Sequence, residues 1–189
     1  GVELATFTLP TIGRSNADTM ADLLELQDGI RVVSLHYNPA EGTEYEYVEI
    51  KNVSLNSLDL SKVGFATGID FRFPKLTLAP QERGILVENR VQYETFHGVS
   101  TPVIGQYTGK LSNDGETLRL EAGPHGFVIQ EFRYEDTWHP SADGSGDRLE
   151  VVDEDAAAET WNTAAQWTTG TVSVTDPYAL WIQSNLSTL

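Results

Sequence analysis

The segment GKLSNDGETLRL, residues 109–120, joins a cluster of small and polar residues to a run in which apolar and polar residues alternate. In an extended chain, Leu118 and Leu120 point to the same side, and the residues between them point to the other. Asp114-Gly115 is among the strongest short signals for a β-hairpin, because glycine adopts positive φ without steric cost. The segment therefore predicts a tight hairpin turn that leads into a half-buried strand.

The same polar cluster has a catalytic or metal-binding interpretation. Asp114 and Glu116 are two residues apart, so on a strand their carboxylates would share one side. No histidine and no second acidic cluster lie near them in the sequence. We therefore favour the turn.

Alternating runs recur along most of the chain. They predict about eight short strands, with one or two helical turns at 91–98; the strand segments are 31–37, 45–52, 58–66, 70–74, 83–89, 116–122, 126–134 and 148–152. Short strands separated by turn residues are typical of an all-β sandwich or barrel, and not of alternating βαβ units. We expect an all-β fold with two stacked sheets.

The composition narrows the classes of partner. The chain has 189 residues, of which 40% are hydrophobic, enough to bury a core. Its net charge is −16, and its 12 lysines and arginines are scattered, so it lacks the basic stripe that nucleic acid or an anionic membrane requires. No apolar run of membrane-spanning length is present, so we expect no membrane insertion. The absence of cysteine excludes thiol catalysis, disulfides and cysteine zinc sites.

The pattern divides the chain into three parts. Residues 1–29 form an N-terminal linker or extension, whose helical segment presents Met20, Leu23 and Leu24 on one face and ends at Asp28-Gly29. Residues 30–153 form the sandwich. Residues 154–189 form a C-terminal arm and the start of a truncated following segment, with a helix beginning at Asp176-Pro177. The fold thus carries short helical extensions at both ends.

A calcium site is one alternative for the segment DGSGD, residues 143–147. Asp143, Ser145 and Asp147 have the spacing of the first ligands of an EF-hand loop, and Glu154 falls at its twelfth position. Arg148 stands where that loop requires glycine, so we favour a glycine-rich turn before the last strand. A surface calcium site made by Asp143, Asp147 and Glu154 remains the alternative.

The remaining candidates carry weaker signals. The four histidines (36, 97, 125 and 139) lack metal-ligand spacing, so we expect them at the ends of strands or loops. The four tryptophans (138, 161, 167 and 181) could stack on sugar rings if exposed, but packing of the C-terminal arm is favoured. No nucleophile elbow, P-loop or dinucleotide fingerprint occurs, although a triad assembled from distant segments stays open.

The order of these segments resembles the lamin tail domain family, over residues 30–167. The matching segments are HYNP (36–39), EYVEIKN (46–52), LDLS (58–61), DFRFPKLTLAPQERGILVEN (70–89), GKLSNDGETLRL (109–120) and TWHPSADGSGDRLEVVDEDAAAETWNTAAQW (137–167). The departures, Phe65, Gln81 and Asp147-Arg148, all lie at turn or strand positions.

The resemblance implies an immunoglobulin-like antiparallel β-sandwich with no shared active site and no cofactor, hence not an enzyme. The LHYNP opening (35–39) looks most like bacterial copies, which occur in large exported or cell-surface proteins. We therefore expect a non-catalytic, extracytoplasmic module that contacts protein partners or positions neighbouring modules. A calcium- or carbohydrate-binding accessory module is the alternative.

Overall fold

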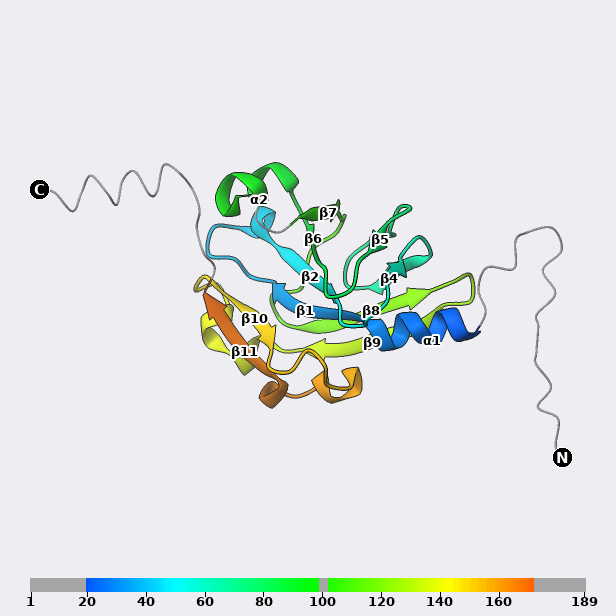
Figure 1. Cartoon of the computed structure of the whole chain (residues 1–189). Coiled ribbons are helices and arrows are strands. Elements are labelled where there is room, and N and C mark those ends of the chain that lie inside the picture. The colour runs from blue at the N-terminus through cyan, green and yellow to red at the C-terminus, as the bar shows by residue number, and fades with distance from the viewer. Residues whose placement is uncertain (1–19, 99–101, 172–189) are drawn as a thin grey trace, which may run out of the picture.

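The computed structural model describes residues 20–98 and 102–171 (Figure 1). These residues form two α-helices, α1 (Met20–Gly29) and α2 (Arg90–His97), and the strands β1 (Ile30–His36), β2 (Tyr47–Asn52), β3 (Leu58–Asp59), β4 (Val63–Thr67), β5 (Thr77–Leu78), β6 (Arg83–Val87), β7 (Val103–Gln106), β8 (Glu116–Ala122), β9 (Phe127–Tyr134), β10 (Asp147–Val151) and β11 (Trp167–Thr171). None of the helices in this part of the chain is long and apolar enough to cross a membrane.

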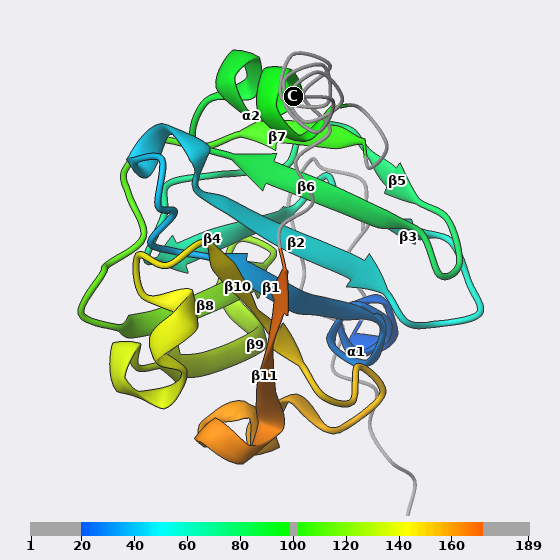
Figure 2. The same ribbon diagram turned by 90° about the vertical axis from the view of Figure 1, so that its left-hand side faces the viewer.

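The strands form three sheets, which confirms the prediction of a mostly β fold. The largest has the order β11-β10-β1-β2-β6-β7, a second has the order β4-β8-β9, and β3 pairs with β5 alone. Figure 2 shows the strands of the large sheet rotating progressively from β6 to β11, the usual twist of a β-sheet. In Figure 1, β8 and β9 run along one side of β1 and β2, and α2 lies on the other side.

The main core lies between the six-stranded and three-stranded sheets. Alternation places Val48 and Ile50 of β2 in this core, and Leu118 and Leu120 of β8 face them from the other sheet. A smaller cluster lies on the outer face of the large sheet, where Tyr93 of α2 packs over β2 and β6. The two faces of the large sheet are therefore covered differently, and only part of the outer face lies under α2.

The segment 109–120 is a tight turn, but the expected hairpin is wrong. Gly115 has φ 82°, and a Cβ there would lie 2.5 Å from the Tyr134 carbonyl oxygen, so this position requires glycine. The strand before the turn, β7, pairs with β6 in the large sheet, whereas β8 pairs with β4 and β9. The turn carries the chain from one sheet to the other.

The strands differ from the prediction in four places. Residues 70–74 make only isolated bridges, Gly64 with Arg72 and Asp70 with Thr108. Strands β5, β7 and β11 were not expected, because β5 has only two residues and the short sequences VIGQ and WTTGT contain glycine and little apolar alternation. Strand β7 pairs parallel to β6, so the antiparallel description fails for that pair.

Helix α1 packs onto the sheets through Leu26 and the partly buried Leu23, so only one of the three residues of the predicted face contacts the core. It ends at Gly29 as expected, but Leu26 is 8% exposed whereas Met20 and Leu24 are 62% and 44% exposed. The Gln27 amide Nε2 donates to the Val128 carbonyl oxygen at 2.8 Å, which fastens the helix to β9. The helix therefore belongs to the packed body.

The C-terminal segment also enters the core beyond residue 153. Trp161 is fully buried and Trp167 nearly so, with ring centroids 6.1 and 5.3 Å from that of Phe132. Trp138 packs partly buried against the same core, so the packing interpretation is confirmed for these three tryptophans. The core thus extends past both limits of the predicted segment 30–153. Trp181, the helix at Asp176-Pro177 and residues 1–19 lie outside the described residues.

Candidate binding groove on the six-stranded sheet

The outer face of the large sheet carries a row of polar side chains across its central strands. Because alternate residues of β2 point to opposite faces, Glu49 points outward while Val48 and Ile50 point into the core. Ser34 of β1 lies in register with Glu49 on one side and with Glu150 of β10 on the other. This register brings residues far apart in the sequence into one polar row.

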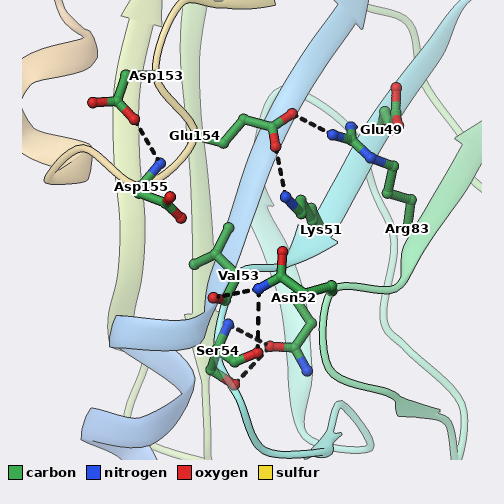
Figure 3. Close-up of polar contacts among 10 residues, drawn as sticks. Glu49, Lys51, Asn52, Val53, Ser54, Arg83, Asp153, Glu154 and Asp155 are labelled. Atoms are coloured by element: carbon green, nitrogen blue, oxygen red, sulfur yellow. Dashed lines mark hydrogen bonds and ion pairs between the residues drawn. The ribbon is translucent and has the colours of Figure 1, made fainter.

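Ion pairs surround this row, as Figure 3 shows for its β2 and β6 end. The Glu154 carboxylate accepts from Lys51 Nζ at 2.8 Å and from Arg83 Nη2 at 2.5 Å, and Arg83 Nη1 also donates to Glu49 at 2.9 Å. Burial alone would raise the pKa of Glu154, but its two cationic partners outweigh that effect and lower it. Glu154 is therefore a stable anion that links β2 and β6 to the chain after β10.

A second ion pair lies at the β10 end of the row. Arg148 donates to Glu150 and, through Nη1, to the Thr171 carbonyl oxygen at 2.8 Å. Burial lowers the pKa of Arg148, but Tyr47 and Glu150 more than compensate and the net shift is upward. Both arginines of the face are thus held in fixed positions by carboxylates.

Helix α2 forms one wall above this face. Asn89 caps the helix by accepting from the backbone N–H groups of Val91 and Gln92 at 3.1 and 3.3 Å. The rings of Tyr93 and His97 pack edge-on against Tyr47 at centroid distances of 5.4 and 5.7 Å. These contacts fix the helix over β2.

His36 lies under the same aromatic cluster. It is 1% exposed, its ring centroid is 5.3 Å from that of Tyr47, and neither ring nitrogen has a hydrogen-bond partner among the described residues. Burial, reinforced by His97 and Arg148, lowers the pKa of His36 to about 3. His36 and His97 stand at the ends of β1 and α2, as expected, and His36 is a neutral packing residue.

A groove of about 460 Å³ opens between α2, the ion pairs and β11. Its lining residues are Val33, Ser34, Tyr47, Glu49, Arg83, Ile85, Tyr93, His97, Arg148, Glu150, Val151, Glu154 and Thr171, and most of the accessible lining is polar. The Ser34 hydroxyl is buried and has no hydrogen-bond partner within the described ranges. No general base therefore contacts this hydroxyl, and it is not arranged as a nucleophile.

The structure does not bring the predicted calcium ligands together. Asp143 accepts from Asn38 Nδ2 at 2.6 Å, Asp147 begins β10, and Glu154 follows the end of that strand in its ion pairs. Across residues 20–98 and 102–171, no group of three or more His, Cys, Asp or Glu side chains is placed to hold a metal ion. The DGSGD segment is a turn, with Gly144 and Gly146 at φ 72° and 97°.

Asp114 and Glu116 also have separate environments. Glu116 Oε1 accepts from the Ser112 N–H at 2.8 Å and from the Tyr134 hydroxyl at 3.2 Å, so this carboxylate closes the turn. Asp114 is exposed, and its N–H donates to Ser112 Oγ at 3.2 Å. The structure therefore supports the turn and not a carboxylate pair.

Comparison with known proteins adds no relative to this picture. No model of a known protein family matches the chain, and a search of curated proteins finds no match.

Proposed function

We propose that this chain is a non-catalytic interaction module of lamin tail type, with an immunoglobulin-like sandwich, within a larger exported bacterial protein. It acts outside the cytoplasm and contacts protein partners or neighbouring modules. The ordered motifs between residues 30 and 167 support this proposal, as does the packing of two main sheets around one core. The sheet topology indicates which surface of the module would contact a partner.

The observation that carries the proposal is the edge strand β11. It is the outermost strand of the six-stranded sheet beside β10. Its sequence, WTTGT, contains three threonines and no charge. Sheet edges in monomeric proteins are usually protected by charged residues, proline or a bulge, because unpaired backbone groups recruit other strands. An uncharged, threonine-rich edge is suited to pairing with a strand of another protein.

The pairing register identifies which backbone groups are available. The Val152 N–H donates to the Gln166 carbonyl, and the Trp167 N–H turns away from β10 to donate to Ala164. Hydrogen-bonded and non-hydrogen-bonded pairs alternate along an antiparallel ladder, so Thr169, opposite Leu149, directs its N–H and C=O away from β10. Thr169 is therefore the centre of the proposed pairing edge.

Photo-crosslinking from the edge tests this proposal. A photoreactive amino acid at the exposed Thr168 should give one defined adduct with a partner protein or neighbouring module in the native cells. The matched control places it at Leu55, which is 87% exposed and lies between β2 and β3. Thr169→Pro should abolish the adduct without loss of the fold, because it removes an outward N–H and no ladder bond. The same adduct from Leu55, or one that survives Thr169→Pro in the folded protein, would contradict the proposal.

A further inference from the structure

The groove on the outer face has a polar lining whose carboxylates are all paired with cations. The lining carboxylates of Glu49, Glu150 and Glu154 are matched by the lining cations Arg83 and Arg148 and by Lys51, which is not part of the lining but pairs with Glu154. A ligand with net charge would have to break one of these pairs and leave a partly buried charge uncompensated, which costs binding free energy. The groove therefore favours a polar ligand without net charge.

The paired side chains keep hydrogen-bonding capacity for such a ligand. A guanidinium group has five N–H donors and a carboxylate has about four acceptor sites, and the pairs above use only part of them. Arg83 lies beside Glu49, and Arg148 beside Glu150, so planar donors and planar acceptors are adjacent at both ends of the row. A hydroxyl group both donates and accepts hydrogen bonds, so neighbouring hydroxyls of one ligand can bond to these adjacent donors and acceptors.

An independent observation comes from the floor of the groove. Ser34, between Glu49 and Glu150, is 2% exposed, and its hydroxyl oxygen has no partner in the described part of the chain. A buried polar group without a hydrogen bond is destabilising, and such groups are uncommon in folded proteins. A ligand hydroxyl that reaches the floor would supply the missing bond.

We propose that the groove between α2 and β11 binds a neutral polyhydroxylated ligand, a saccharide. Its volume of about 460 Å³ lies within the range of small-molecule sites, and Tyr47 and Tyr93 add an apolar wall on the α2 side. The groove shares Thr171 with β11 but does not include Thr169, the centre of the proposed pairing edge, so the saccharide site adds a ligand to the proposed protein contacts. The buried Trp161 and Trp167 take no part in it.

An NMR titration of the full chain tests the saccharide site. The probes are neutral tetrasaccharides of glucose, N-acetylglucosamine and xylose, with an anionic tetragalacturonate as the charged comparison. At least one neutral probe should shift the amide signals of Ser34, Glu49 and Glu150. Because the ligand is neutral, its affinity should change less than about twofold between about 50 and 500 mM NaCl.

Variants separate a binding role from a structural one. Ser34→Ala should weaken the neutral probe by about fivefold or more and leave the melting temperature unchanged or raised, because it removes an unsatisfied hydroxyl. Thr77→Ala, which removes an exposed hydroxyl on β5, should change neither. Glu150→Gln, which leaves Arg148 without its anion, should also weaken the neutral probe and serves as the second variant if Ser34→Ala does not fold.

Four results would overturn the saccharide site. They are the absence of any shift at roughly 10 mM probe, shifts confined to residues outside the groove, tighter and salt-sensitive binding of the anionic probe, and unchanged affinity in folded Ser34→Ala. None of them would affect the proposed contacts of β11, which the Thr169→Pro cross-linking experiment tests separately.

Discussion

Glu46 is a buried carboxylate that should make stability depend on pH between about 4.5 and about 7. Its side chain is fully buried at the start of β2, where Oε2 accepts from the Leu111 N–H at 2.9 Å and from the Tyr107 hydroxyl at 3.4 Å. Oε1 has no partner among the described residues. Burial, only partly offset by the Leu111 N–H and by Lys110, raises the pKa of Glu46 to about 7.

The sign and size of the effect follow from proton linkage. The folded protein holds the Glu46 proton up to about pH 7, whereas the unfolded chain releases it near 4.5. The contribution is thus fully present below about pH 4.5 and is lost as pH rises through about 7. At about 1.4 kcal/mol per pKa unit, the rise of the Glu46 pKa from 4.5 to about 7 on folding corresponds to roughly 3–4 kcal/mol of unfolding free energy.

Glu46→Gln isolates this contribution, because glutamine mimics the protonated carboxyl at every pH. As the pH rises from about 4.5 to about 8, urea unfolding should show that the variant gains roughly 3–4 kcal/mol of stability relative to the parent chain. Glu44→Gln, two residues away at an exposed position, should differ from the parent by less than about 0.5 kcal/mol throughout. A difference between Glu46→Gln and the parent that stays constant with pH would refute the reasoning.

Three further substitutions test the core and its buried polar groups. Trp161→Ala should lower the unfolding free energy by about 3–5 kcal/mol in urea titrations, since the ring is fully buried against Phe132. A loss below about 1 kcal/mol would place the C-terminal segment outside the core. Because the pKa of His36 is lowered to about 3, its contribution to stability is present above about pH 6.5 and is lost as pH falls toward 3. His36→Phe should therefore reduce the drop in melting temperature between about pH 7 and about pH 4.5, and an equal drop in both proteins would contradict this. The buried Asn52 amide donates to three carbonyls and accepts two hydrogen bonds from Ser54. Asn52→Ala should therefore lower the unfolding free energy by roughly 3 kcal/mol or more in the same urea assay. A loss below about 0.5 kcal/mol would show that these bonds do not hold the β2–β3 connection.

Local sequence signals predicted the strands whose apolar residues alternate. The run 116–122 matches β8 at both ends, and the segment 45–52 contains β2, whose alternate residues Val48 and Ile50 are buried, because burial of one face leaves a period of two in the sequence. The segment 91–98 likewise gave the helical turns of α2. These features depend on neighbours in the chain and can therefore be recognised locally.

Features that depend on distant neighbours were missed. Strand β11 has little apolar alternation, because a threonine-rich edge owes its conformation to pairing with β10. The choice of Leu26 over Met20 and Leu24 as the packed residue of α1 depends on where β9 lies. The hairpin expected at Asp114-Gly115 was wrong for the same reason, since turn chemistry specifies a reversal and not which sheet the chain enters.

The candidate groove was likewise beyond local reasoning. Glu49 could be identified as an outward residue of its strand, but Ser34 and Glu150 join it only through the order β10-β1-β2. The spacing of Glu154 suggested only an alternative calcium site, whereas its partners Lys51 and Arg83 come from β2 and β6. The spacing of residues along the chain does not predict such contacts between strands.

Amide hydrogen exchange along β11, followed by NMR in the full chain, tests the proposed pairing edge most directly. The amides of Thr168 and Gly170, which face β10, should exchange slowly, and the outward amide of Thr169 should exchange rapidly until a partner is added and then become protected. Slow exchange at Thr169 in the isolated chain would mean that the edge is already covered. Unchanged rapid exchange in the presence of the cross-linked partner would mean that the partner binds elsewhere, and either result would contradict the proposed role of β11.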